Sequence, residues 1–377
     1  MTYSSWIATC PHETVNVLTQ ELSALGITQQ KILHRGVAFE TDLETAYRAH
    51  LSLRTASRIQ RVVATFDAPD LATFENSLKT ILWNQWLRSH RPFTVQVALT
   101  DEQAQNLGEE NLIAAVINSI QKSPFEKSPP AFNPNSENSI SIVVFMRNGQ
   151  CVLGIDTAGR ALHKRGWRTN GHPAVLKETL AASILMLAGY TGSETLLDPM
   201  CGSGTLVIEA AYIALNKAPL IHRGKDDFAL EHLAGFDRAL WRRVSDQLRA
   251  AKKNDLEFPI YASDIRQDYV DVARASALKA RVEKYLQFSS KPFQDWTPPT
   301  PTGLLVANLP YGERIGGGMI NSLYKEIGET LESRFSRWRV ALLAPDKSPI
   351  HLLKLKSPTV IPLMNGALSV NLLVTLK

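Results

Sequence analysis

Apolar positions in the C-terminal half of the chain switch repeatedly between short uninterrupted runs and a helical period. A short run bounded by turn residues is typical of a buried strand, and a period near 3.6 residues is typical of an amphipathic helix. This alternation predicts a parallel sheet covered by helices on both faces, with ligands at the carboxyl ends of the strands. The predicted strands are 195–198, 259–264, 303–307 and 338–344, and the predicted helices are 205–216, 268–280 and 320–334.

The last segment, 360–376, has a different pattern. It places the pair Asn365-Gly366 between two apolar stretches, and Asn-Gly is a strong signal for a tight hairpin turn. We therefore expect the sheet to end in an antiparallel pair, which would distinguish it from an ordinary dinucleotide-binding sheet.

The N-terminal half alternates over shorter distances, which predicts small α+β units with helices packed on a sheet. A loop rich in proline and polar residues, 123–136, interrupts the second unit without dividing it. The predicted strands are 5–9, 32–39 with a break at Gly36, 62–66, 93–99 and 140–145, and the predicted helices are 13–25, 44–51, 71–86 and 112–121.

The length of 377 residues predicts two or three domains, and we place them at 1–58, 59–158 and 159–377. No apolar stretch is long enough to cross a bilayer, and the first residues lack a secretion signal, so we expect a cytoplasmic protein without a membrane partner. The three cysteines are scattered, which indicates neither a disulfide framework nor a metal site.

Positive charge is concentrated in the C-terminal part. Residues 1–159 hold 12 Lys+Arg and 15 Asp+Glu, and residues 160–377 hold 29 and 21, so the two parts carry −3 and +8. This distribution favours a polyanionic partner such as RNA, although a solvated basic surface is the ordinary alternative. Arg48, Arg54, Arg58 and Arg61 recur near helical spacing and could contact phosphates or form a solvated helix face.

A cationic segment precedes the predicted parallel sheet. It holds Lys164, Arg165 and Arg168 around Trp167, a combination that can contact both phosphates and bases. The alternative is a tether whose tryptophan packs between domains. We take these four residues as candidates for RNA binding.

The string from Asp198 to Thr205 turns an apolar strand into a glycine loop and then a helix. Gly202 and Gly204 allow the main chain to turn tightly and approach a ligand, and the helix beginning at Thr205 directs free N–H groups toward the loop. Asp198 and Cys201 complete the candidate cofactor loop. No histidine partner in the sequence marks Cys201 as a nucleophile.

Two further acidic residues follow predicted strands. Asp264 ends the second strand and could accept both hydroxyls of a nucleoside ribose, or cap the helix that follows. Its distance from the glycines is explained by an insertion at 216–258. Asp295, after a third strand-like segment, could accept a hydrogen bond from an adenine amino group.

The fourth candidate element ends in Asn308-Leu-Pro-Tyr311. An amide oxygen, a main-chain carbonyl near Pro310 and an aromatic ring at the sheet edge are the parts needed to hold a planar amine. Two acceptors would direct the nitrogen lone pair toward an electrophile while Tyr311 stacks on the ring. An Asn-Pro turn with a packing tyrosine is the alternative.

These motifs resemble those of class I S-adenosylmethionine-dependent methyltransferases that modify amino nitrogens. The strings Leu162-His-Lys-Arg-Gly-Trp-Arg168 and Asn216-Lys-Ala-Pro-Leu-Ile-His-Arg223 further resemble THUMP-containing RNA guanine-N2 methyltransferases. The resemblance implies a Rossmann-like methyltransferase domain at 159–377, preceded by a ferredoxin-like piece and a THUMP domain. It also implies S-adenosylmethionine on Asp198, Cys201, Gly202, Gly204, Thr205, Asp264, Asp295 and Asn308, a guanine against Asn308, Pro310 and Tyr311, and no metal.

The resemblance has one local departure, because members usually have proline where Leu309 stands. It also leaves several functions open. Methylation of 23S rRNA is the first expectation, and tRNA methylation, DNA adenine-N6 methylation and non-catalytic RNA binding are the alternatives. Some relatives carry a second methyltransferase domain, whereas this sequence predicts one.

Overall fold

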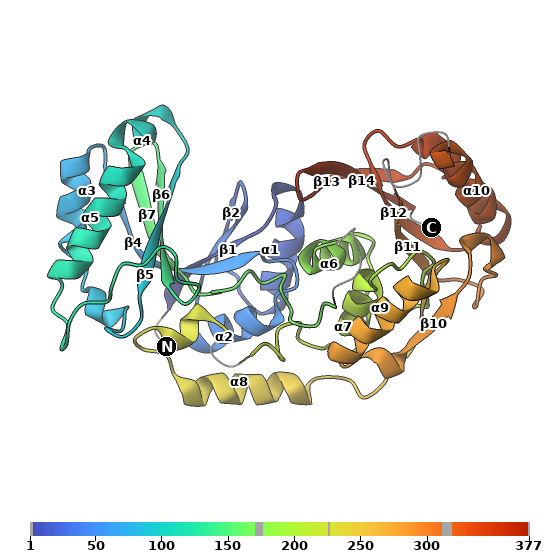
Figure 1. Cartoon of the computed structure of the whole chain (residues 1–377), viewed down its shortest axis with the longest axis horizontal. Coiled ribbons are helices and arrows are strands. Elements are labelled where there is room, and N and C mark those ends of the chain that lie inside the picture. The colour runs from blue at the N-terminus through green and yellow to red at the C-terminus, as the bar shows by residue number, and fades with distance from the viewer. Residues whose placement is uncertain (1–2, 170–175, 225–226, 311–318, 376–377) are drawn as a thin grey trace.

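The computed structural model describes residues 3–169, 176–224, 227–310 and 319–375. The described chain forms two seven-stranded sheets, one from the N-terminal half and one from the C-terminal half, placed side by side along the long axis of the molecule (Figure 1). The predicted α/β class with an α+β N-terminal region is confirmed.

The N-terminal sheet has the strand order β2-β3-β1-β4-β7-β6-β5. Its strands are β1 (Ser4–Thr9), β2 (Gln30–Leu33), β3 (Gly36–Thr41), β4 (Arg58–Asp67), β5 (Phe93–Leu99), β6 (Ile140–Arg147) and β7 (Gln150–Asp156). Its helices are α1 (Val15–Ala24), α2 (Leu43–Ser52), α3 (Leu71–Leu78), α4 (Glu102–Leu107) and α5 (Glu109–Lys122).

Strand β4 carries this sheet across the boundary that the sequence predicts between residues 58 and 59. Residues 58–61 pair with β1, and residues 60–67 pair with β7 on the other side. Because one strand serves both halves, the two predicted N-terminal units form one continuous sheet.

The C-terminal sheet has the order β10-β9-β8-β11-β12-β14-β13. Its first five strands run parallel, and β14 pairs antiparallel with both β12 and β13, so the predicted terminal hairpin is confirmed. The strands are β8 (Leu196–Asp198), β9 (Ile260–Asp264), β10 (Leu286–Ser290), β11 (Leu304–Asn308), β12 (Arg339–Pro345), β13 (Thr359–Asn365) and β14 (Leu368–Thr375).

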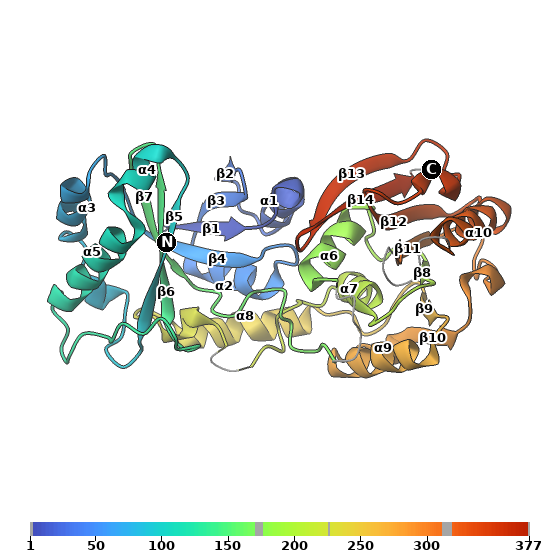
Figure 2. The ribbon, with the colours of Figure 1, turned by 45° about the horizontal axis from the view of Figure 1, so that its top comes forward.

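Helices cover both faces of the C-terminal sheet, as the predicted alternation requires. Apolar residues of α6 (Glu178–Leu187), α7 (Thr205–Ala214) and α9 (Gln267–Lys279) share one core with the strands. Residues of α10 (Met319–Arg334) form a second core on the opposite face (Figure 2). The helices cover the two faces of the sheet, and the carboxyl ends of the parallel strands lie at an edge between the two helical layers.

The predicted insertion leaves the C-terminal domain and packs on the N-terminal half. Its helix α8 (Arg238–Ala250) lies along α2, where Trp241 meets Tyr47 edge to face at 5.2 Å. Arg243 Nη2 also lies 3.0 Å from Glu44 Oε2. The insertion therefore joins the two halves of the molecule.

The segment 71–86, predicted as one helix, is divided. Helix α3 ends at Leu78, and a short 3-10 turn, Trp83–Gln85, follows. The indole of Trp83 is fully buried and donates to Ser119 Oγ at 2.8 Å, so the break turns this side chain into the core. Across the described ranges, no helix combines the length and apolar character needed to span a bilayer.

Candidate functional site

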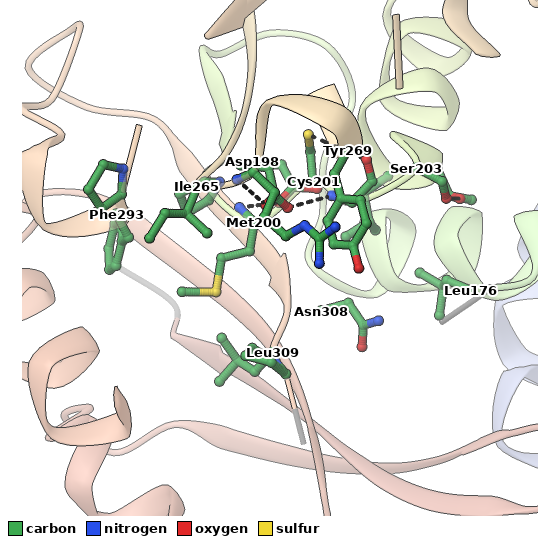
Figure 3. Close-up of a pocket in the computed structure, with 18 of the residues that line it drawn as sticks. Leu176, Asp198, Met200, Cys201, Ser203, Ile265, Tyr269, Phe293, Asn308 and Leu309 are labelled. Atoms are coloured by element: carbon green, nitrogen blue, oxygen red, sulfur yellow. Dashed lines mark hydrogen bonds between the residues drawn. The ribbon is translucent and has the colours of Figure 1, made fainter. Parts of the chain in front are cut away.

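Three neighbouring parallel strands bring together side chains that are far apart in the sequence. Strands β9, β8 and β11 are adjacent in the sheet and end at Asp264, Asp198 and Asn308. All three residues line a cavity of about 390 Å³ (Figure 3). The predicted assembly of these residues at one sheet edge is therefore present.

The glycine loop forms one wall of this cavity. The Cys201 N–H donates to the Ser263 carbonyl at 2.8 Å, which ties the loop to the end of β9. Gly202 lines the cavity with φ 51°, and Thr205 begins α7 beside it. These main-chain positions agree with a loop built to approach a ligand.

Gly204 has a different role within the same loop. Its φ of 80° is in the left-handed region, and an added Cβ would lie 3.0 Å from the Cβ of Ala273 on α9. The glycine therefore permits close packing between the start of α7 and α9, and it places the loop rather than lining the cavity.

Asp264 holds the loop from the side of β9. Its Oδ2 accepts from the Gly202 N–H at 3.0 Å, and its Oδ1 accepts from the Arg266 N–H at 3.1 Å. Helix α9 begins at Gln267 with Arg266 as its N-cap, so Asp264 is not the cap of that helix. Each carboxylate oxygen keeps a lone pair for a further donor, which is what two ribose hydroxyls require.

Asp198 is 1% exposed and accepts from the Met200 N–H at 3.1 Å. Burial raises the pKa of this carboxyl well above its ordinary range, and the charge of nearby Asp264 adds to the rise. A buried carboxylate of this kind is stabilised by a cation. Burial also raises the pKa of the Cys201 thiol, which keeps it protonated and argues against a nucleophilic role.

Asn308 lies across from the loop residues that are joined by dashed lines in Figure 3. Its half-buried side chain makes no hydrogen bond with any described residue, so its amide is free to bind a ligand. Leu309 and Pro310 also line the cavity. The Leu309 N–H donates to the Leu343 carbonyl at 2.9 Å, a bond that proline at this position could not make.

Two predicted site residues are not placed in the cavity by the structure. Tyr311 lies outside the described residues. Asp295 is exposed on a short 3-10 turn, Phe293–Asp295, and it is Phe293 and Gln294 that line the cavity. Because β10 ends at Ser290, Asp295 lies beyond the strand and not at its end, and its contact with the cofactor stays a prediction.

The structure also corrects the prediction that Arg165 and Trp167 contact RNA. The Arg165 side chain is 0% exposed, and its Nε lies 3.3 Å from Oε1 of Glu209. It also donates to the carbonyls of Leu162 and Arg54, at 2.7 and 2.6 Å. Trp167 is 2% exposed and belongs to the apolar core. Both residues hold the linker in place, which is the alternative tether function.

The other two residues of the cationic segment remain at the surface. Lys164 is exposed. Arg168 keeps 22% of its side chain exposed but pairs with Glu178 at 2.9 Å and donates to the Leu176 carbonyl. RNA binding by Lys164 and Arg168 stays a prediction, with Lys164 the freer of the two.

Several apolar lining residues escape sequence reasoning because ordinary core positions look the same in a sequence. Ile265 is the one that the sequence could have indicated, because it follows the candidate residue Asp264 directly. In the structure its side chain lines the cavity and is 69% exposed. The other apolar lining residues missed are Leu176, Met200, Leu206, Phe293 and Leu323. No group of three or more metal-ligating side chains occurs within the described part of the chain.

Solved structures with the same fold cover nearly the whole chain. The structure of SMU.472, provisionally named a methyltransferase and complexed with SAH, is 28% identical, covers 99% of this chain and 98% of its own, and has a TM-score of 0.86. A Listeria monocytogenes protein, named as a predicted N6-adenine-specific DNA methylase, is 25% identical over 99% and 96% of the two chains, with a TM-score of 0.83.

Curated relatives are more similar in sequence. Ribosomal RNA large subunit methyltransferase K/L of Vibrio campbellii is 33% identical over 97% of this chain, which spans about half (52%) of that protein. The Synechocystis protein slr0064, provisionally named an RNA methyltransferase, is 30% identical over 98% of this chain and 95% of its own length.

Family models match two parts of the chain. Residues 5–60 match the RlmL ferredoxin-like domain, in agreement with the predicted N-terminal piece. Residues 165–373, which contain the whole cavity, match the RMKL-like methyltransferase domain. The chain belongs to the RMKL-like methyltransferase family.

Proposed function

We propose that this protein transfers a methyl group from S-adenosylmethionine to the exocyclic N2 amine of a guanine in RNA, with 23S rRNA as the first candidate substrate. The observation that carries the proposal is the free amide of Asn308, which stands at the same cavity as the two acidic strand ends. The family supplies the methyltransferase class, and the K/L and slr0064 relatives are both named for RNA.

The residues present fit S-adenosylmethionine. Asp264 has lone pairs left for ribose hydroxyls, and the exposed side chain of Ile265 next to it offers an apolar surface for the adenine ring. Asp198 places a buried carboxylate where the positively charged part of the cofactor would offset its charge. When bound, the cofactor supplies a methyl group on an electrophilic sulfonium.

The protein's own residues have one main task in this reaction, which is alignment. The Asn308 amide oxygen can accept one N–H of the guanine amine, and a main-chain carbonyl near Pro310 can accept the other. Both N–H groups are then held while the nitrogen lone pair faces the methyl carbon. The guanine must leave its helix to reach the cavity, as in other enzymes that act on a base.

The alternative functions differ in the nucleic acid or base that would receive the methyl group. Adenine-N6 methylation of DNA would use the same Asn308 grip, and the relative from Listeria carries such a name. Methylation of tRNA would keep the guanine chemistry and change the RNA. A non-catalytic RNA-binding protein would have no use for an amide kept free at the cavity.

One experiment separates these functions. The protein is incubated with methyl-labelled S-adenosylmethionine and total RNA from a strain lacking its gene, and separately with unmethylated DNA, and the labelled nucleoside is identified and mapped. We expect N2-methylguanosine in the large ribosomal RNA fraction. Label in N6-methyladenosine, or no label with any substrate that the protein binds, would contradict the proposal.

A further inference from the structure

A second cavity, of about 310 Å³, is lined by residues of the N-terminal half and of the insertion, and it shares no lining residue with the cofactor cavity. Three parts of the chain meet there. Tyr3, Ser4 and Leu43 come from the ferredoxin-like piece, and Arg61 comes from β4, the strand that both N-terminal units share. Gln85 and Trp86 come from the second unit, and Ala234 and Gly235 come from the insertion. The Ala234 N–H donates to the Trp86 carbonyl at 3.0 Å, which holds the insertion against the rim.

Arg61 occupies an inward position of β4. It lies two residues after the fully buried Ile59, so both side chains point to the same face of the sheet. Its guanidinium lies 5.4 Å from the ring centroid of Trp6 and 4.9 Å from that of Trp86. Two indole rings therefore hold this cation at the wall of the cavity.

The guanidinium of Arg61 has no anion and no hydrogen-bond acceptor among the described residues. Its Nε is buried and unpartnered, and burial lowers the pKa of the side chain. Arg58, at the start of the same strand, pairs with Asp156 at 2.5 Å instead. Contact with two indoles compensates only part of the cost of a half-buried charge, so an anionic partner is the group this site lacks.

We propose that this cavity binds a phosphate group of an RNA strand through the Arg61 guanidinium. The planar fork of arginine matches phosphate geometry, and a half-buried cation gains more from such a pair than one in open solvent. The volume accommodates a mononucleotide unit. This inference rests on the proposed function only in taking RNA as the partner. It places an RNA contact far from the methyl-transfer site.

The position of the site predicts which step it affects. Because Arg61 lies on β4 of the N-terminal sheet and the cofactor cavity is lined by residues of the C-terminal domain, the loss of Arg61 should weaken RNA capture without changing the methyl-transfer step. In steady-state kinetics, KM for RNA should rise while kcat stays near the parent value.

The test measures binding of a fluorescein-labelled, mixed-sequence, 12-nucleotide single-stranded RNA to the full chain at several salt concentrations, without cofactor. The variants are Arg61→Gln and Arg61→Lys. The matched control is Arg35→Gln, which removes one charge from an exposed turn of the same sheet. Melting temperature reports whether each variant is folded.

We expect Arg61→Gln to weaken binding about tenfold and to reduce the slope of log K against log salt by about 0.7, the contribution of one single-strand phosphate contact. Arg61→Lys should recover part of the affinity, and Arg35→Gln should retain most of it. A folded Arg61→Gln protein with parent affinity and parent salt slope would overturn the proposal.

A direct readout uses the Nε–H resonance of Arg61, assigned by its absence in Arg61→Lys. This resonance should shift on addition of the oligonucleotide and respond only weakly to adenosine monophosphate at equal concentration. If the protein bound adenosine monophosphate as tightly as the RNA oligonucleotide, the proposal of an RNA site would be overturned in favour of a site for a small nucleotide. Neither measurement requires turnover, so failure of the proposed methylation would not be mistaken for failure of this site.

Discussion

Asp198 places a carboxyl group in a buried position, with no cation paired to it among the described residues. Burial, with the charge of Asp264, raises the pKa of this carboxyl, so the folded state holds the proton more tightly than the unfolded state does. The free energy of unfolding contributed by Asp198 therefore falls as the pH rises from about 4, the ordinary carboxyl value, through the raised pKa.

We predict that Asp198→Asn makes the ligand-free protein more stable than the parent by roughly 1–2 kcal/mol at pH 8, with the difference shrinking toward pH 4. The asparagine oxygen can still accept from the Met200 N–H. The affinity of the Asp198→Asn protein for S-adenosylmethionine should nevertheless fall roughly 10–100-fold, since the cofactor loses the carboxylate as a charged partner. Denaturant titrations at both pH values and calorimetry measure the two effects.

The control is Asp295→Asn, which removes the same charge from an exposed position. Its stability should stay within about 0.5 kcal/mol of the parent at either pH. If Asp198→Asn were destabilising at pH 8 and bound the cofactor normally, the carboxylate would be structural rather than a ligand.

Asn308 is expected to act on the chemical step. Its amide aligns the acceptor amine with the methyl carbon, an interaction that strengthens toward the transition state. We predict that Asn308→Ala slows single-turnover methyl transfer about 10²-fold or more, while cofactor affinity changes little. Asn371→Ala, on β14 of the same sheet, is the control and should react at the parent rate. Equal rates for both variants would remove Asn308 from the proposed grip.

Asp198, Asp264 and Asn308 could be predicted because each ends a strand of an alternating pattern, and parallel strands end at one edge. Polar lining residues that do not end a strand, such as Arg266 and Gln294, were not predicted. The surroundings of Arg165 and Asp295 could not be predicted. A sequence shows that Arg165 is charged, but only the fold shows that Glu209 lies buried beside it. The position of Asp295 differs from the prediction because β10 ends at Ser290, just before Pro292, and Asp295 is the last residue of the short 3-10 turn that follows.

At the scale of the elements, the contact between α7 and α9 depends on a single missing side chain. Gly204 has both a left-handed backbone and a close neighbour in Ala273. Gly26 has the same backbone, with φ 81°, but a Cβ added there would have no atom within 4 Å.

We predict that Gly204→Ala lowers the free energy of unfolding by roughly 2–5 kcal/mol, because a backbone cost of about 1–2 kcal/mol is added to overpacking of about 1–3 kcal/mol. Gly26→Ala should show the backbone cost alone. Denaturant titration of both proteins gives the difference. Equal losses would mean that α9 shifts freely and that the contact does not place the loop.

The elements themselves were largely predictable, since the C-terminal strands and helices fall close to their predicted ranges. Strand β7 and helix α4 fall outside every predicted range. The break at 71–86 arises from a tertiary requirement, because burial of Trp83 against Ser119 interrupts an otherwise helical pattern. The continuity of the N-terminal sheet also escaped prediction. The pattern of β4 shows a strand but not that both of its edges are paired.

At the scale of the whole molecule, the Arg165–Glu209 pair connects three parts of the chain. Arg165 lies in the linker, Glu209 lies on α7 behind the cofactor loop, and the Arg54 carbonyl that Arg165 also binds belongs to the N-terminal half. We predict that Arg165→Met costs roughly 3–5 kcal/mol, because it leaves the Glu209 carboxylate buried without its partner. Denaturant titration measures this loss.

The double variant Arg165→Met with Glu209→Leu should recover part of that stability, since both charges of the pair are removed together. The recovery should be incomplete because Arg54, which is half-buried and also interacts with Glu209, stays charged. Lys164→Met, at the exposed neighbouring position, should change stability by about 0.5 kcal/mol or less. A single variant as stable as Lys164→Met would show that the pair does not hold the halves together.

Because the insertion packs on the N-terminal half, the core of that half can be completed only after part of the methyltransferase domain has been synthesised. The core of that half includes Leu162 and earlier residues, but also Phe228 and Val244, which are made after β8 and α7. The ribosome adds roughly 5–20 residues per second, so the ~80 intervening residues take on the order of 4–16 s. During that interval the first strand and helix of the methyltransferase domain emerge while the earlier domain still has an uncovered apolar surface. We therefore expect the nascent chain to be open to chaperone binding until α8 has left the exit tunnel and closed that surface.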